Sequence, residues 1–209
     1  EFESIRKVGK IAIRLVEGDE LIGVGMTGGN NDILIATHDG KCIRFNESDV
    51  RVMGRDTQGV RSIKLAKDDY VVDMAVITEG NQIITISENG YGKRSDESEY
   101  RTQTRGGKGV KAGNFSAKTG KLVNLKQIGE NQDIMLIADS GIIIRLKAED
   151  ISLIGRDTQG VKIMRLKDGA KIVCVSVAEH EEDEETPTEE VENTLTEEQI
   201  EYAEQETEE

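Results

Sequence analysis

The sequence predicts an all-β protein, a propeller-like array of four-stranded blades that repeats about every 50 residues. The heptapeptide GRDTQGV occurs at 54–60 and again at 155–161, and TRGGKGV takes the corresponding place at 104–110. The glycine before the last valine of these segments marks each unit, as Gly59, Gly109 and Gly160. A second glycine recurs in register with it, as Gly40, Gly90 and Gly141. Two landmarks that keep register over three units indicate an internal repeat.

Short segments rich in Val and Ile, separated by Gly, Asn or Asp turns, are the expected strands. The first unit, about 9–58, has them at 11–15, 20–27, 32–38 and 41–45. The second unit, about 59–108, has them at 62–65, 70–77, 82–87 and 91–95. The third unit, about 109–159, has them at 121–128, 133–138 and 142–146. The fourth unit, 160–178, has only 163–166 and 171–178, so we expect about three and a half blades.

Charge divides the chain into two regions. The whole sequence has 27 Lys and Arg against 41 Asp and Glu, a formal net charge of -14. Residues 179–209 hold 16 of the acids and no Lys or Arg, so 1–178 has a net charge of +2. We therefore expect a β domain at 1–178 and a mostly disordered acidic tail at 179–209. A capping box and hydrophobic staple around Thr196 predict one short helix in the tail, from about Glu197.

Composition argues against several classes of protein. The two cysteines, Cys42 and Cys174, lie far apart in apolar runs, so we expect neither a disulfide framework nor a metal cluster, and a reducing cytoplasm is favoured. No apolar run approaches the roughly 18 residues of a membrane span. The first residues do not form a signal peptide and include no initiator Met, so we expect the chain to start inside a longer protein. The Tyr and His residues lack a supporting cluster, and we expect no catalytic or metal site.

Basic residues recur at four positions of the repeat, which we number as columns. The first column lies four residues before the marker glycine and consists of Arg55, Arg105 and Arg156. The second lies four residues after the other glycine and consists of Arg44, Arg94 and Arg145. The third consists of Arg14, Lys64 and Arg165, with Asn114 in the third unit. The fourth lies two residues after the marker and consists of Arg61, Lys111 and Lys162.

A repeating fold places equivalent positions on one rim, so these columns predict a curved positive stripe. Strand alternation is expected to turn Arg14 and Lys64 outward and the neighbouring Ile13, Leu15, Ile63 and Leu65 inward. Such a stripe is typical of a sequence-tolerant polyanion binder. Aromatic residues make up only 3% of the chain, which disfavours single-strand binding by base stacking. Duplex DNA held through its phosphates fits better.

The loop at 103–109 is the most specific local signal. Its glycines can bring backbone amides close to an anion between two cations. The sequence GGKG lacks the GK[ST] ending of a P-loop, so we do not expect a nucleotide site. The candidate DNA-binding residues of the loop are Gln103, Arg105, Gly106, Gly107, Lys108 and Gly109.

Together, the Q-x-R-G-G-K-G loop, the blade length, the GRDTQGV loops and the acidic C-terminal tail resemble the C-terminal domain of the DNA gyrase A subunit. The resemblance covers the whole chain. It implies a six-bladed β-pinwheel, in which neighbouring blades exchange strands and duplex DNA wraps around a basic outer rim. The chain has Thr104 where the family's loop usually has a second basic residue. The family's defining loop lies in the first blade, so we expect 103–109 to belong to a late blade.

The resemblance also implies partners and a setting. Wrapped DNA would serve ATP-dependent negative supercoiling by a type IIA topoisomerase, in a heterotetramer of A and B subunits in the bacterial cytoplasm, associated with the nucleoid. The chain would be a fragment of an enzyme subunit without catalytic residues or a cofactor of its own, since ATP and Mg²⁺ would be used elsewhere in the parent enzyme. No membrane partner is expected.

Three alternatives remain open at this point. The chain is similar to the corresponding domain of topoisomerase IV almost as much as to that of gyrase. A blade array can also serve as a protein-interaction scaffold without binding DNA. The acidic tail is expected either to aid solubility alone or to compete with DNA phosphates for the basic rim.

Overall fold

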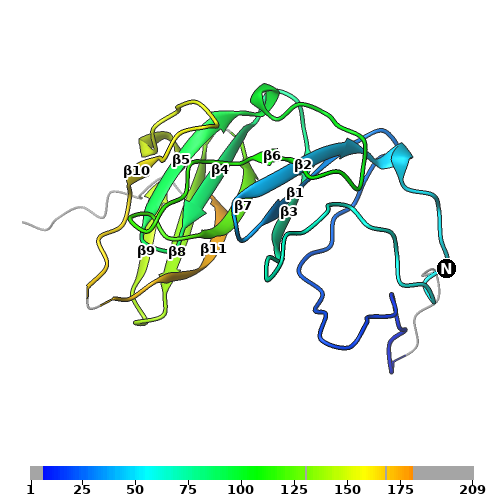
Figure 1. The fold of residues 1–209 in the computed structure, drawn as a ribbon. Coiled ribbons are helices and arrows are strands. Elements are labelled where there is room, and N and C mark those ends of the chain that lie inside the picture. Colours follow the sequence, from blue (N-terminus) through cyan, green and yellow to red (C-terminus); the bar gives the residue numbers. More distant parts are fainter. Residues whose placement is uncertain (1–6, 130, 168, 181–209) are drawn as a thin grey trace, which may run out of the picture.

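The computed structural model describes residues 7–129, 131–167 and 169–180 (Figure 1). Within them the protein is all-β, with eleven strands and three short 3₁₀ helices at Glu47–Asp49, Glu97–Glu99 and Ala148–Asp150. The fold class predicted from the repeat is confirmed. The described part contains no helix long and apolar enough to cross a membrane. The predicted tail helix, and all of the acidic tail beyond His180, lie outside the described residues.

The strands form three antiparallel sheets. The first sheet has the order β3-β1-β2-β6 and consists of β1 (Asp32–Thr37), β2 (Lys41–Asn46), β3 (Val71–Ile77) and β6 (Val110–Lys111). The second has the order β10-β5-β4-β7 and consists of β4 (Gln82–Ser87), β5 (Tyr91–Asp96), β7 (Leu122–Ile128) and β10 (Val161–Lys162). The third has the order β11-β8-β9 and consists of β8 (Gln132–Ala138), β9 (Ile143–Lys147) and β11 (Ile172–Glu179).

Each sheet is built around a tight hairpin at the second landmark glycine. The glycine N–H closes the turn in all three sheets: Gly40 to Thr37 O at 2.9 Å, Gly90 to Ser87 O at 3.1 Å and Gly141 to Ala138 O at 3.0 Å. The DG, NG and SG dipeptides therefore act as the hairpin turns that the sequence predicted.

Strand exchange joins successive sheets. The short strand β6 follows β5 in the chain, yet it pairs with β2 of the preceding sheet through Cys42↔Val110. In the same way β10 pairs back to β5 through Val161↔Gly92. The marker glycines make this approach possible, because a Cβ on Gly109 would lie 2.3 Å from Cys42 O and one on Gly160 would lie 2.9 Å from Gly92 O. The exchange expected of a β-pinwheel is thus present in the first two sheets.

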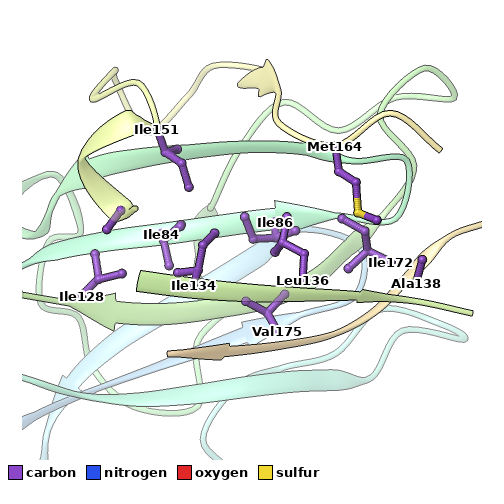
Figure 2. Packing of buried hydrophobic residues seen from close by; sticks show 11 residues of the cluster. Ile84, Ile86, Ile128, Ile134, Leu136, Ala138, Ile151, Met164, Ile172 and Val175 are labelled. Atoms are coloured by element: carbon purple, nitrogen blue, oxygen red, sulfur yellow. The ribbon is translucent and has the colours of Figure 1, made fainter. Parts of the chain in front are cut away.

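The core lies between the sheets. Strand β4 is buried on both faces because its sheet is the middle one of the three. Ile83 packs with Leu34 and Leu122 toward the first sheet. Ile84 and Ile86 point the other way, toward Ile134 and Leu136 of β8, as Figure 2 shows. Burying one such side chain contributes about 2 kcal/mol to stability.

Four predicted strands are wrong: 11–15, 20–27, 62–65 and 163–166 are not strands in the structure. Segment 20–27 corresponds to β3, β7 and β11, each of which pairs with an earlier strand, and the described residues before it contain no such strand. Segments 62–65 and 163–166 bond to neighbouring loops and turns; Ile163 N and Met164 N, for example, both donate to Gly90 O.

The predicted inward orientation of four aliphatic residues holds for one of them. Ile63 is buried, at 4% exposed, and packs on Ile43 and Phe45. Ile13, Leu15 and Leu65 are 37%, 47% and 42% exposed. These three side chains remain near the surface because their segments are not strands of a closed sheet.

Candidate nucleic-acid interface

One backbone hydrogen bond recurs at the spacing of the repeat and connects the repeated loops. In each case the backbone N–H of the third-column residue donates to a carbonyl of the next loop: Arg14 N to Thr57 O at 3.1 Å, Lys64 N to Gly107 O at 2.8 Å, and Asn114 N to Thr158 O at 3.0 Å. We call the resulting surface the loop ladder; it consists of 54–61, 104–111 and 155–162 with the segments 11–14, 62–65 and 111–114. The ladder brings the first and fourth basic columns, with Arg14 and Lys64 of the third, onto one continuous feature.

The first-column arginines clamp consecutive loops together. Each guanidinium donates through Nη1 to a carbonyl earlier in the chain: Arg105 to Arg61 O and Arg156 to Lys111 O, both in the fourth column, and Arg55 to Ile11 O. Through Nε, Arg105 also donates to Asp49 O and Arg156 to Glu99 O, both at 3.1 Å. Several of the five guanidinium N–H groups are therefore used inside the fold. No sequence pattern signals these contacts, which join residues 44 or 45 positions apart.

The second-column arginines are fixed within their sheets. Arg44 pairs with Asp32 at 2.7 Å and with Glu97, and its side chain is only 12% exposed. Burial alone would raise the pKa of Asp32, but hydrogen bonds from Asn46, Arg44 and Thr102 hold it below its usual range.

The other two members of the second column are held in a similar way. Arg94 donates to Gln82 Oε1 and Ile151 O, each at 2.7 Å, and Arg145 pairs with Asp133 at 2.7 Å. The structure thus gives the whole second column partners within the protein, on the sheets rather than on the loop ladder.

Unpaired positive charge gathers around the loop at 104–110. The side chains of Arg61, Lys64 and Lys108 are exposed and form no ion pair or side-chain hydrogen bond with the described residues. The position of Gly106 is occupied by Asp56 and Asp157 in the other two loops. No acid of its own neutralises this loop, which makes it the most positive of the three.

The other two loops carry acids that pair with the basic columns. Asp56 lies 2.8 Å from Arg14, and Asp157 lies 3.9 Å from Lys111. Lys162 contacts the Tyr91 ring at 4.4 Å and donates to Asn89 O at 3.0 Å. Arg165 is exposed and has no side-chain partner among the described residues.

The loop glycines are partly occupied by structural contacts. Gly106 has a φ of +82° and donates its N–H to Ser62 O at 2.7 Å, so this amide is not open to an anion. Gln103 N donates to Arg44 O at 2.7 Å, which anchors the loop on β2. The Gly106 amide is therefore used inside the fold, while Lys108 presents its cationic side chain to solvent.

One functional candidate was not found by sequence reasoning. Lys93 of β5 is 2% exposed, and its ammonium lies among the carbonyl oxygens of the loop at 155–161. Its only signal in the sequence is that the equivalent positions are Ile43 and Ile144. The described residues contain no group of three or more His, Cys, Asp or Glu side chains placed to hold a metal.

Known proteins similar to this chain share both its repeat and its fold. A family model described as the DNA gyrase C-terminal domain, β-propeller, matches residues 1–27, 31–78, 81–128 and 132–179. The last two of these segments each contain four strands, three for their own sheet and one for the preceding sheet. The boundaries of the family repeat thus coincide with the strand exchange.

Curated relatives come from the same family. The DNA gyrase A subunit of Halalkalibacterium halodurans is 60% identical over 183 residues, which is 88% of this chain and 22% of the relative. The DNA gyrase A subunit of Escherichia coli strain K12 is 39% identical over 189 residues, 90% of this chain and 22% of the relative. The chain spans about a fifth of the length of these relatives.

Solved structures of the same fold agree. A DNA gyrase A C-terminal domain superposes with a TM-score of 0.74 at 30% identity, covering 82% of this chain and 58% of that one. The C-terminal domain of a DNA topoisomerase IV reaches 0.79 at 24% identity, covering 85% and 56%, and shows the shared fold alone. The matched repeats and the identity to gyrase A subunits show that this chain belongs to the family of DNA gyrase C-terminal domains.

Proposed function

We propose that the chain binds duplex DNA without sequence preference and wraps it along the loop ladder. The observation that carries the proposal is the set of exposed, unpaired cations Arg61, Lys64 and Lys108 beside a loop that contains no acid. Lys111, Lys162 and Arg14 extend the same feature over neighbouring repeats, and the exposed Arg165 lies three residues beyond it in sequence. A DNA phosphate bound there would replace condensed counterions, which makes affinity strongly dependent on salt.

In this proposal the arginine columns have two different roles. Arg55, Arg105 and Arg156 hold successive loops in register and offer their remaining N–H groups to phosphates. The second column stabilises the sheets, and we leave Arg44, Arg94 and Arg145 out of the proposed contact surface. The lysines and arginines of the third and fourth columns then supply most of the phosphate contacts.

We further propose that this DNA binding serves a larger enzyme. The chain's relatives are gyrase A subunits several times its length, so the wrapped duplex would be delivered to a cleavage core in other parts of the protein. ATP and Mg²⁺ would act in those parts and in the B subunit, in the bacterial cytoplasm. The resulting activity would be the introduction of negative supercoils.

A protein-interaction scaffold is the alternative that one observation favours. Apolar side chains are exposed on the third sheet and beside it, including Ile142, Ile143 and Val173. Exposed apolar groups of this kind are typical of protein contact surfaces. A scaffold of this kind would not need the unpaired cations of the loop ladder.

Binding of a random-sequence duplex, measured by fluorescence anisotropy over a range of salt, tests the proposal. Replacing Lys64 and Lys108 together by Ala should weaken binding about tenfold at low salt and reduce the salt slope by roughly 1.8, about 0.9 for each lost phosphate contact. Lys147→Ala, on the third sheet away from the ladder, is the matched control and should bind like wild type. If wild type does not bind at low salt, the scaffold alternative is favoured.

A further inference from the structure

A buried ammonium lies directly beneath one of the ladder's loops. Lys93 Nζ donates to Gly155 O at 3.2 Å, to Arg156 O, and to Thr158 O at 3.0 Å. An ammonium has three N–H donors and no acceptor, so three carbonyls satisfy it fully. Among the described residues, Arg156 O has no other donor, whereas Thr158 O also accepts from Asn114 N and Gly155 O also accepts from Thr158 Oγ1.

The equivalent strand position differs where the loop differs. Beneath the TRGGKGV loop the residue is Ile43, and a Cβ on Gly107 would come within 3.7 Å of its Cδ1. Beneath the GRDTQGV loop at 155–161 the residue is Lys93. An apolar side chain therefore lies under the glycine loop, and a hydrogen-bond donor lies under the loop whose carbonyls turn inward.

We propose that Lys93 is a positioning residue for the loop at 155–161, and that the residue at this strand position and the loop that crosses it form a matched pair. Lys93 supplies the donors that hold Gly155, Arg156 and Thr158 against β5. The loop so held keeps Lys162 at the place where the ladder continues.

The contacts around the loop show why this position matters for the ladder. Thr158 O accepts from Lys93 and also from Asn114 N, the bond that links this loop to the preceding repeat. Arg156, two residues earlier, clamps Lys111 O and Glu99 O. Loss of the ammonium would leave Arg156 O without a donor and would remove one of the two donors of Gly155 O and of Thr158 O, which should weaken both connections together.

Amide hydrogen exchange of the loop tests the proposal directly. Lys93→Ile should lower the protection of amides in 155–161 by about tenfold or more, while protection in 104–110 stays unchanged. Adding D157G, T158G and Q159K to Lys93→Ile creates a glycine-type loop over an isoleucine and should restore protection. Ile43→Met, which keeps an apolar residue under the glycine loop, is the matched control and should leave both loops protected.

Each outcome decides the question. Unchanged protection of 155–161 in Lys93→Ile would overturn the positioning role. If Lys93→Ile does not fold, folding of the compensated variant supports the matched pair, and failure of both to fold overturns it. The extension of this proposal to DNA rests on the proposed function: anisotropy of the same variants should show weaker binding for Lys93→Ile. If the wild-type protein does not bind DNA, the extension to DNA binding is contradicted, but the result of amide hydrogen exchange on the loop still stands.

Discussion

The loops at 104–110 and 155–161 occupy the same place in successive repeats and direct their charge in opposite ways. Around the first loop, Arg61, Lys64 and Lys108 point their charge to solvent, and the loop contains no acid. At the second loop, Lys93 is buried beneath the backbone and Asp157 lies near Lys111. In the proposed function the first loop meets an external anion, whereas the charged groups of the second loop are used in contacts within the protein. A repeat in sequence need not be a repeat in function.

The largest expected effect comes from breaking the strand exchange that directly follows the first loop. Gly109→Ala would place a Cβ 2.3 Å from Cys42 O at a φ of +68°, so strand β6 could not stay paired with β2. We expect a loss of about 3 kcal/mol in the free energy of unfolding, measured by urea denaturation. Gly141→Ala introduces only the backbone strain of a φ of +82°, because no atom lies within 4 Å of the new Cβ. It should lower the free energy of unfolding by about 1 kcal/mol. Equal losses in the two variants would contradict this interpretation.

A smaller effect follows from the buried charge that only one of the loops has. Burial, the largest influence, lowers the pKa of Lys93 to about 8 from its usual 10.5; Arg156 adds to this, while Glu99, Asp157 and Cys42 oppose it. Between these two values the unfolded chain binds more protons than the folded protein. The contribution of Lys93 to the free energy of unfolding should therefore increase as the pH rises from about 8 to about 10.

Lys93→Met removes the titrating group and isolates this contribution. The difference in the free energy of unfolding, wild type minus variant, should increase across that pH window. Ile43→Met, at the equivalent position under the other loop, should give a difference that does not vary with pH. Parallel profiles for wild type and Lys93→Met would contradict the assignment.

The smallest expected effect comes from giving the first loop the acid that the others have. Gly106→Asp would add a carboxylate to the loop that contains Lys108 and bonds to Lys64, and there is room because the nearest atom to a new Cβ is 3.7 Å away. Duplex affinity should fall about fivefold at low salt. Gly106→Asn carries the same backbone strain without the charge and should bind within about twofold of wild type. Equal binding by the two variants would show that the missing acid has no part in DNA binding.

Local patterns predicted the fold well where strands pair with their neighbours in sequence. The ranges 82–87 and 70–77 agree with β4 and β3 to within one residue, because hairpins depend on nearby residues and turn glycines. The strands β6 and β10 could not be predicted as such. They have two residues each, and their partners lie in the preceding sheet.

The candidate site was predictable in position but less so in role. The first and fourth columns and part of the third identified residues of the loop ladder, since equivalent positions of a repeat occupy equivalent places, whereas the second column lies on the sheets. The donor choices of Arg105 and Arg156 depend on carbonyl groups brought close only by the fold. Lys93 stood out from Ile43 and Ile144 in the alignment of the repeats, but nothing local indicated that its charge would be buried.

The exchanged strands interlock successive sheets of the array. The first sheet uses residues from Asp32 to Lys111, and the second uses residues from Gln82 to Lys162. The two spans overlap, so a single backbone cut in the overlap would leave fragments still held by strand pairing. During synthesis the first sheet can close only after the hairpin of the second has been made. The first and second sheets are therefore completed only by a strand that follows the next hairpin, and the adjacent blades become mechanically linked as they fold.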